Sequence, residues 1–490
     1  MTSSKSTKRA LITSALAILM CAAMLIGTTF AWFTDTASTG VNKIVSGNLK
    51  VDIIGADSDS HIEKLNFTKA ATTDAEAGAE ILWEPGCRYL TEGFRIANKG
   101  NLALKWKAQV NTGTTAANEG NFDLLDVIDF YLVTKAADGT ETETALDEFT
   151  GNLKKTETSD VYYIKGVMQT TAGNDYQGLT LDGISITVVA TQDTVESDSF
   201  DNQYDKDAEY PILVTTGDEL QAIVSNAKAP VNIVLTNSIT TNNFVIPADK
   251  DVTLDLNGRT VTNAGSHTIL NKGHLTLTDS SADKSGQIIS LKGNTAALRN
   301  GDNAVCVVEG GTISRDGANG NTWHVVENFG KMTFNGGKVV LKNGNGFAIT
   351  NGWNYFDPGA STTHAVMEIN ALELDTDSSG IKNCRYGDLT VNDVTVTSTG
   401  YWALSNDYLG TAVINGGTLT SNSFKAVSNG AAMTVNGGTF DGTQGFFVQS
   451  YATSTVLNGG TFANMNVDAL SSYVGTGHTA QQSGTSVIIK

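Results

Sequence analysis

The sequence has few cysteines, few prolines and little positive charge. Four Cys residues in 490 positions are too few for a disulfide framework. Only 32 Lys and Arg stand against 51 Asp and Glu, so nucleic acid is excluded as a partner, because neutralising phosphates requires clustered positive charge. Only 5 Pro accompany 50 Gly, amid abundant Thr, Asn and Val, which predicts an all-β protein with many tight turns. Charged residues make up 17% and hydrophobic residues 40%, which excludes a disordered polyelectrolyte and provides material for large cores.

The amino terminus has the layout of an export signal. A stretch with Lys and Arg precedes an almost wholly apolar run over residues 10–30, and small residues at the end of that run predict cleavage between Ala31 and Trp32. The alternative is an uncleaved anchor, because about 20 apolar residues can span a bilayer. Cleavage would leave an odd number of cysteines, Cys87, Cys306 and Cys384, which argues against a fully paired set.

Three patches in the first 200 residues carry a recognisable pattern. They are Gly27 to Ala37 with its continuation to Val51, then Trp83 to Trp106, and Gly178 to Gln192. Together they resemble the TasA/camelysin family of Gram-positive bacteria, whose members are exported by a signal peptidase of the SipW type. The resemblance implies a jelly-roll β-sandwich over residues 32–200, a SipW-type peptidase as a partner, and a place in an extracellular matrix or biofilm.

The same resemblance suggests a way to assemble. In that family the mature N-terminal segment can complete the open sheet edge of a neighbouring subunit, which is β-augmentation. Here the candidate donor runs from Trp32 to Ile54, and its assembly residues are Asn42, Leu49, Val51 and Ile53. The partners would be further copies or related matrix subunits. The alternative is that this strand pairs within its own sandwich.

Alternating apolar and polar residues predict the sandwich strands. The clearest case is Phe94 to Val110, where alternation on both sides of Asn98 to Asn101 predicts a hairpin. Further strands are expected at 49–54, 130–134, 162–168 and 184–190.

Metal ligands are sparse. Camelysin relatives have been described as metallopeptidases, but no two of the 6 His have the four-residue spacing of a zincin helix. Residues 201–213 form an acidic linker whose carboxylates would suit Ca²⁺, but a solvated charge run is the favoured interpretation. The nearest approach to a calcium motif is Asp375 and Asp377, where the EF-hand pattern fails at its last position, Tyr386. We therefore expect no cofactor other than Ca²⁺.

The carboxy-terminal half, residues 214–490, is a repeat array. An apolar-Asn-Gly-Gly-Thr-apolar element recurs at Asn415, Asn436 and Asn458, with intervals of 21 and 22 residues. This period is too short for a propeller blade and suits one rung of a right-handed parallel β-helix, with Asn and Gly providing positive-φ turns. The flanking apolar residues, such as Val435 and Phe440, should point inward. A capping box at Thr216 and Glu219 predicts a short helix that covers the first rung.

One interval between repeats is longer than the period of about 22 residues. Asn335 to Asn370 spans 35 residues, and the excess around 343–363 contains Trp353, Tyr355 and Phe356. An insertion in a solenoid maps to a loop on one face, often the binding face, so these aromatics are candidates for stacking on sugars. The alternative is a packed loop that covers the flank of the β-helix.

Three functions fit these features. The first is a secreted surface or matrix protein that assembles through its sandwich and displays the β-helix. The second is an adhesin that binds glycan or host protein through the β-helix. The third is a polysaccharide lyase or glycosidase, for which no catalytic motif stands out, so an enzyme is not expected. The chain shows no sortase motif, so a cleaved product would be released or held by its partners.

Overall fold

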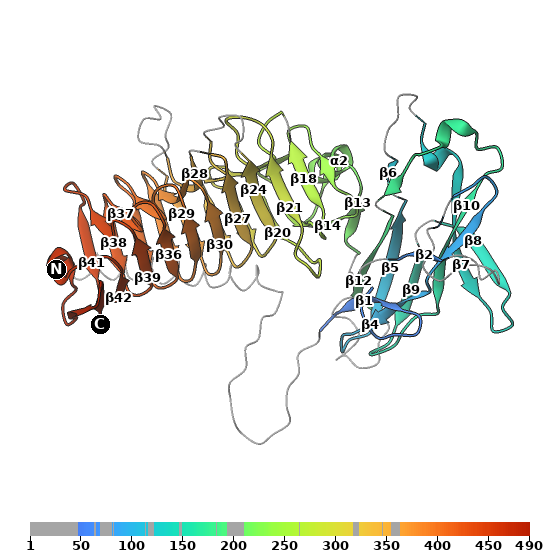
Figure 1. Ribbon diagram of the computed structural model, residues 1–490, viewed down its shortest axis with the longest axis horizontal. Helices are drawn as coiled ribbons and strands as arrows, with labels where there is room; N and C mark the ends of the chain where they lie inside the picture. The colour runs from blue at the N-terminus through green and yellow to red at the C-terminus, as the bar shows by residue number, and fades with distance from the viewer. Residues whose placement is uncertain are drawn as a thin grey trace, which may run out of the picture.

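The computed structural model describes most of the chain from residue 48 onwards. The described residues are 48–62, 65–68, 81, 83–112, 114–115, 122–146, 149–182, 184–193, 210–263, 265–316, 323–344, 346–353 and 363–490. The predicted signal peptide, Ala31, Trp32 and Asn42 lie outside them, as do Tyr355, Phe356 and most of the acidic linker. Within the described part, no helix is long and apolar enough to cross a membrane. The fold is all-β, with an antiparallel part followed by a parallel β-solenoid (Figure 1).

The antiparallel part consists of two sheets with one shared core. The seven-stranded sheet contains β1 (Val51–Gly55), β2 (Phe67–Thr68), β3 (Arg88–Thr91), β4 (Phe94–Asn98), β7 (Ile128–Lys135), β8 (Glu141–Ala145) and β10 (Tyr162–Met168). The three-stranded sheet contains β5 (Leu104–Asn111), β9 (Phe149–Leu153) and β12 (Ser185–Gln192), and a small pair joins β6 (Thr114–Thr115) to β11 (Leu181–Asp182). Two short 3₁₀ turns complete this part, η1 (Leu124–Asp126) and η2 (Asn174–Tyr176).

Side chains from both sheets meet in this core. Phe94 and Ile164 of the larger sheet pack with Leu104 and Trp106 of the smaller one, and all four are almost fully buried. The expected sandwich strands are therefore present. The jelly-roll topology stays a prediction.

The predicted hairpin between Phe94 and Val110 is wrong. β4 pairs with β1 and β10, whereas β5 pairs with β9 and β12 in the other sheet. The Asn98 side chain stabilises the crossing, because its Nδ2 donates to the carbonyls of Leu102 (2.7 Å) and Lys154 (3.1 Å). Its Oδ1 accepts from the Gly100 N–H at 2.9 Å. Alternation alone cannot distinguish two strands of one sheet from two strands of facing sheets.

The last part of the predicted assembly strand forms β1, which pairs within the seven-stranded sheet of the same chain. β1 lies at the edge of the seven-stranded sheet and pairs antiparallel with β4, with Val51 opposite Asn98 and Ile53 opposite Ile96. Leu49 precedes the strand and is exposed. The rest of the candidate donor before Asn48 lies outside the described residues.

The solenoid has about 10 turns over residues 212–462, built on three sheets. The first sheet stacks β13 (Ile212–Val214), β14 (Val231–Leu235), β17 (Asp251–Asp255), β20 (His274–Thr278), β23 (Val305–Val308), β26 (Lys331–Phe334), β29 (Ala365–Ile369), β32 (Gly387–Val391), β35 (Thr411–Ile414), β38 (Ala432–Val435) and β41 (Ser454–Leu457). The second stacks β15 (Ile239–Thr240), β18 (Thr260–Asn263), β21 (Gln287–Ser290), β24 (Thr312–Asp316), β27 (Lys338–Lys342), β30 (Glu373–Thr376), β33 (Thr395–Ser398), β36 (Thr418–Ser421), β39 (Thr439–Gly442) and β42 (Gly460–Phe462), and ends in an antiparallel hairpin of β43 (Ala480–Ser483) and β44 (Ser486–Ile489). The third stacks β16 (Val245–Ile246), β19 (Ile269–Asn271), β22 (Leu298–Asn300), β25 (Val326–Asn328), β28 (Phe347–Asn351), β31 (Ser379–Asn383), β34 (Leu404–Asn406), β37 (Val427–Asn429) and β40 (Phe446–Val448).

From β14 to β40 each rung contributes one strand to each sheet, as the period near 22 residues predicts. The strands pair in parallel and in register, and the apolar residues that flank the Asn-Gly-Gly turns, such as Val435 and Phe440, are fully buried. Phe440 stacks on Phe462 of the next rung at 4.9 Å. The solenoid prediction is confirmed, while its right-handedness stays a prediction.

The role assigned to the repeat asparagines needs correction. In the Asn-Gly-Gly turns the second Gly has positive φ, for example Gly417 at 94° and Gly438 at 107°, whereas the Asn residues do not. Their side chains instead form an exposed ladder, in which each Nδ2 donates to the Oδ1 of the preceding rung at 2.7–2.9 Å. This outer ladder contains Asn335, Asn370, Asn392, Asn415, Asn436 and Asn458.

A second asparagine ladder lies inside the solenoid, at the corner between the third and first sheets. Each Nδ2 donates to the Oδ1 of the next rung at 2.7–2.9 Å, so this ladder runs in the opposite direction to the outer one. The inner ladder contains Asn271, Asn300, Asn328, Asn351, Asn383, Asn406 and Asn429, and all are at most 1% exposed. Because buried amides must be hydrogen-bonded, each rung depends on its neighbours.

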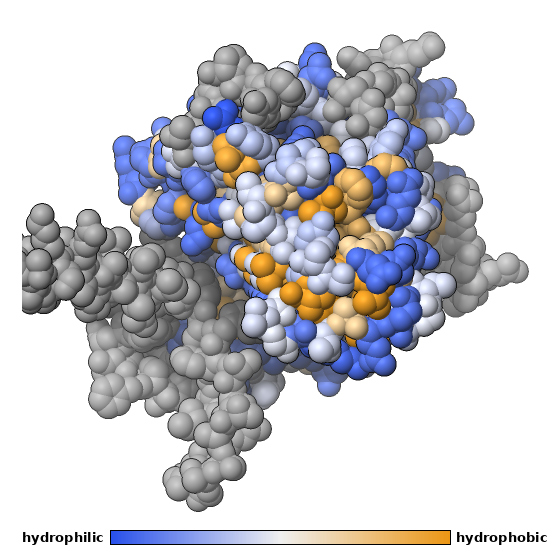
Figure 2. Space-filling view, turned by 90° about the vertical axis from the view of Figure 1, so that its left-hand side faces the viewer, coloured by the Kyte–Doolittle hydropathy of each residue, from blue (hydrophilic) through white to orange (hydrophobic). Residues whose placement is uncertain are grey.

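Both ends of the solenoid core are covered. At the start, α2 (Gly217–Asn226) begins as the capping box predicts, with the Glu219 N–H donating to Thr216 Oγ1 at 3.2 Å, although the Glu219 carboxylate accepts from Thr215 rather than Thr216. At the far end lie α3 (Val467–Leu470), η3 (Ser471–Tyr473) and the β43–β44 hairpin, and Leu470 is buried in the core. Figure 2 looks onto this end, where hydrophobic and polar side chains are interspersed.

The sandwich contacts the start of the solenoid. Arg259 donates to Ser185 Oγ at 2.9 Å, and Asn111 donates to the Thr236 carbonyl at 3.2 Å. A small apolar cluster joins Val189 of β12 to Leu213 and Val234. These contacts leave the outer face of the third sheet, further along the solenoid, away from the sandwich.

Candidate ligand-binding face

The outer face of the third sheet carries a column of side chains that are polar in every strand from β22 to β37 and end in a phenylalanine in β40. From β22 to β37 an apolar residue and a ladder Asn of each strand face the interior, and the residue between them points to the opposite side of the sheet. Of these intervening residues, Glu327, Thr350 and Ser428 are at most 5% exposed. The strand register aligns these outward residues from rung to rung. We call this column the floor; from β22 to β40 it consists of Arg299, Glu327, Thr350, Lys382, Ser405, Ser428 and Phe447.

An aromatic row lies along one side of the floor, where the second sheet turns into the third. Its ring contacts run along the solenoid, with Phe347 stacked parallel to Trp402, two rungs further on, at 6.0 Å, and Trp402 edge-on to Phe424 of the next rung at 5.5 Å. The first aromatic row contains Trp323, His324, Phe347, Tyr401, Trp402 and Phe424. Tyr401 is 53% exposed, so its ring is open to a ligand.

A second set of aromatics lies on the opposite side, where the third sheet turns into the first. Phe329 and Trp353 are in contact at 4.5 Å, and Tyr386, Tyr408 and Tyr451 occupy the corresponding turns of later rungs. These five residues form the second aromatic row. Tyr408 is 45% and Tyr451 56% exposed. The floor is thus bordered by rings on both sides, and the exposed rings are in its carboxy-terminal half.

Lys382 reaches both sides of the floor. Its Nζ lies 5.3 Å from the ring centre of Phe347 in the first row and 3.3 Å from an Asp407 oxygen in the turn on the other side. The Lys382 ammonium group therefore contacts residues on both sides of the floor, so the floor is narrow at this rung. Further along, Lys425 Nζ lies 4.9 Å from the Phe424 ring and 3.7 Å from the Phe447 ring.

The amino-terminal half of the face is more closed. Glu327 is 3% exposed and pairs with Arg299 at 3.1 Å. Burial raises the pKa of Glu327, and the Arg299 guanidinium opposes part of that change. Burial lowers the pKa of His324 to about 4, with Lys382 and Arg315 adding to the effect, so this imidazole is neutral at pH 7. The titratable groups in this half of the face are paired or neutral, so they offer few contacts to a ligand.

Of the three aromatics predicted for ligand binding, the structure describes one. Trp353 follows β28, forms a bridge to Arg385 and packs on Phe329, so it is part-buried in the second row. The extra residues of the long interval do lie in this turn, between β28 and β29. Tyr355 and Phe356 lie outside the described residues.

The two calcium candidates have other partners. Asp375 faces outward from β30 and pairs with Lys342 at 2.8 Å. Asp377 accepts from the Asn343 N–H at 2.6 Å. Across the described ranges, no group of three or more His, Cys, Asp or Glu is placed to hold a metal ion. Cys306 and Cys384 are buried and Cys87 is part-buried, and all three are free thiols.

Most of the aromatics around this face are not among the residues predicted from the sequence. Tyr401, Trp402, Phe424 and Lys425 are spread over two rungs and do not form a cluster along the chain. A signal was present, because aromatic residues recur two or three positions before an apolar-x-Asn triplet, as in Tyr-Trp-Ala-Leu-Ser-Asn over 401–406 and Phe-Ala-Ile-Thr-Asn over 347–351. That triplet marks both the third-sheet strands and the inner ladder.

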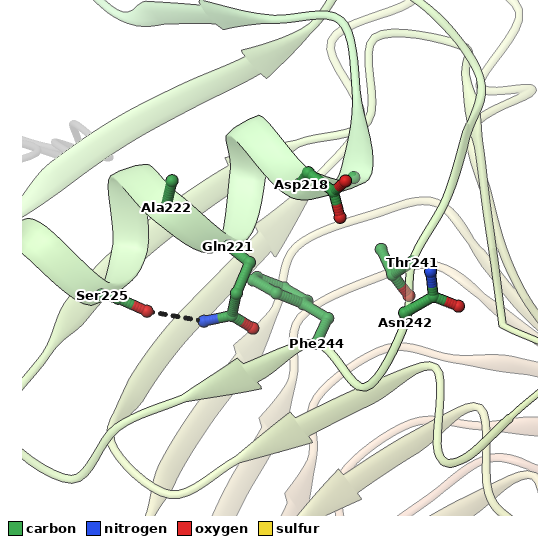
Figure 3. A pocket seen from close by; sticks show the side chains of 8 residues that line it. Asp218, Gln221, Ala222, Ser225, Thr241, Asn242 and Phe244 are labelled. Atoms are coloured by element: carbon green, nitrogen blue, oxygen red, sulfur yellow. Dashed lines mark hydrogen bonds between the residues drawn. The ribbon is translucent and has the colours of Figure 1, made fainter.

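A different hollow lies beside the capping helix. It is bordered by α2 and the first rung, with a volume of about 250 Å³ (Figure 3). Gln221 on its wall bonds to Ser225 Oγ and to both backbone groups of Val245, and Phe244 is buried. Gln221 and Ser225 are thus occupied in attaching the helix to the solenoid.

The comparisons with known proteins give no family assignment. No protein-family model matches this sequence, and no curated protein shows a significant match to it.

Proposed function

We propose that this chain is an exported surface or matrix protein that binds glycans on the outer face of its third sheet. The observation that carries the proposal is the pair of aromatic rows on either side of a polar floor. Aromatic rings stack on the apolar faces of sugar rings, while hydroxyl and ammonium groups between them hydrogen-bond to sugar hydroxyls. Export rests on the signal-like amino terminus and on the resemblance to the TasA/camelysin family.

Binding is favoured over catalysis by the separation of the carboxylates on this face. Glu327 and Asp407 are three rungs apart, which is about 14 Å at a strand spacing of about 4.8 Å. Glycosidases place their two carboxyl groups roughly 5–10 Å apart. Both carboxylates are also engaged by cations, Glu327 by Arg299 and Asp407 by Lys382.

A glycan array and affinity electrophoresis on the chain starting at Trp32 test the proposal. The exposed rings should be changed singly, as Tyr401→Ala, Tyr408→Ala and Tyr451→Ala, because exposed side chains can be removed with little effect on folding. Loss of one stacked ring should weaken binding about fivefold, from roughly 1 kcal/mol of stacking. Tyr131→Ala, on β7 of the sandwich, is the matched control. Absence of binding to any glycan, or equal losses in all four variants, would refute the proposal.

Self-assembly is a second candidate function. β1 is an edge strand, and the segment before it is the predicted donor. Because residues 51–55 already pair with β4, the informative deletion is residues 32–47, which leaves β1 in place. Fibres from the chain starting at Trp32, seen by negative-stain microscopy and absent after that deletion, would support strand donation. A monomer under all conditions, including added Ca²⁺, would exclude it.

A further inference from the structure

We infer that the ligand of the third-sheet face is an acidic polysaccharide, one whose sugars carry carboxylate or sulfate groups. This inference rests on the proposed function and specifies its ligand class. Its basis is where the positive charges lie in a chain of net charge −19.

Positive charge is scarce in the last part of the solenoid and gathers on one face. Between Ser378 and Lys490 the sequence has four Lys and Arg residues, Lys382, Arg385, Lys425 and Lys490. The first three lie on the floor or in the turns that border it, next to β31 and β37. Six Asp residues occur in the same stretch of sequence or directly before it, at 377, 388, 393, 407, 441 and 468. Of these, Asp407 reaches the floor through its contact with Lys382, and Asp377 lies in the β30–β31 turn that borders it, where it accepts from the Asn343 N–H.

Two of the cations are held by aromatic rings instead of carboxylates. The Arg385 guanidinium lies 4.8 Å from the Tyr386 ring centre and donates to the Tyr386 hydroxyl at 3.1 Å. Lys425 lies over Phe424 and Phe447. A ring orients a cation without neutralising its charge, so both groups can form ion pairs with a bound anion.

The positions of these cations suit a polymer. Arg385 is in the turn on one side of the floor and Lys425 in the turn on the other, and the exposed Tyr401 and Tyr408 lie on the rung between them. A glycan along the floor would stack on the tyrosines and place its acidic groups at the two cations. The net negative charge of the whole chain repels a polyanion, so binding would have to come from this local arrangement.

Matched pairs of polymers test the inference by titration calorimetry on the chain starting at Trp32. Dextran sulfate is compared with dextran, and polygalacturonate with its methyl ester, so that the backbone is constant and the charge changes. We expect binding to at least one acidic member, no binding to its neutral partner, and at least about tenfold weakening between 50 and 500 mM NaCl as the charges are screened. Lys425→Gln and Arg385→Gln should each weaken binding about fivefold to tenfold, the effect of one charge-assisted contact. Lys331→Gln, on the exposed face of the first sheet, is the control and should leave binding unchanged.

The outcomes separate this inference from the proposed function. Equal binding of the acidic and neutral partners, or binding that Lys425→Gln and Arg385→Gln leave intact, would overturn the acidic ligand and keep glycan binding. Binding to no polymer of either kind, in a sample folded by circular dichroism, would overturn both. Weakening by Lys331→Gln equal to that by Lys425→Gln would show that net charge, and not this face, is responsible, and would also overturn the inference.

Discussion

Replacing Asn351 by Ala should destabilise the solenoid strongly, because this residue is central in the inner ladder. Its Oδ1 accepts from Asn328 at 2.7 Å, and its Nδ2 donates to Asn383 Oδ1 at 2.9 Å and to the carbonyls of Ala365 (3.3 Å) and Asp388 (3.2 Å). The substitution removes four bonds from a site that is 0% exposed. A hydrogen bond contributes about 1 kcal/mol net, and a buried group left without a partner costs about 1–3 kcal/mol. We therefore expect a loss of about 3–4 kcal/mol.

The outer ladder provides the control. Asn436→Ala removes two side-chain bonds, to Asn415 and from Asn458, but this residue is exposed and water can replace its partners. The expected loss is at most about 1 kcal/mol. Urea unfolding followed by circular dichroism gives both values, and hydrogen exchange in β28 and β31 shows whether the loss spreads to neighbouring rungs, as nearest-neighbour coupling in a solenoid predicts. Equal losses for the two variants would refute the assignment of stability to the buried ladder.

Three further predictions concern pH, thiols and turn geometry. The pKa of His324, about 4, lies below the usual 6.5, so the unfolded chain binds this proton first as the pH falls. The contribution of His324 to stability should be complete above pH 6.5 and decline towards pH 4, by up to about 3 kcal/mol. Burial also lowers the pKa of His267 to about 4, so His324→Gln should reduce the decline in a pH series of urea midpoints and leave the part that is due to His267. Burial raises the pKa of Cys306 and Cys384 to about 12, so both thiols should be unreactive in the native protein. In the chain starting at Trp32, a colorimetric thiol reagent should therefore modify Cys87 alone until urea is added. Rapid reaction of two or three thiols in the native protein would contradict the buried positions. At Gly417 φ is 94°, and an added Cβ would lie 2.6 Å from the Val394 carbonyl oxygen, so Gly417→Ala should lower the free energy of unfolding by at least about 2 kcal/mol. Gly139 has φ of 84° but lies in open space, so Gly139→Ala should lower it by about 1 kcal/mol. Thermal unfolding measures both values, and similar losses would argue against the close packing of the Gly417 turn.

The solenoid was predictable because its repeat is local. Each rung repeats one turn motif, so the spacing of Asn415, Asn436 and Asn458 determines the period, and the apolar neighbours Val435 and Phe440 determine which side faces inward. The sandwich was less predictable because its strand partners are far apart in sequence. The hairpin predicted at 94–110 failed because Asn98 bonds to Lys154, a contact that no local pattern contains.

The candidate site was predictable only in part, for a related reason. The long interval directed attention to one turn and to Trp353, since extra residues are visible in a sequence. The remaining aromatics, such as Trp402 and Phe424, come together only when rungs stack at a fixed register. Their recurrence before four of the apolar-x-Asn triplets, those that end at Asn328, Asn351, Asn406 and Asn429, becomes meaningful once that triplet is known to form a third-sheet strand.

Hydrogen exchange in the presence of a bound polymer would locate the glycan-binding surface on the folded chain. The chain starting at Trp32 would be measured alone and with saturating dextran sulfate or polygalacturonate, whichever binds more tightly. We expect protection in the third-sheet strands and turns between residues 379 and 451, with the sandwich unchanged. Protection confined to the sandwich, or to the first or second sheet, would contradict the assignment of this face as the glycan-binding site.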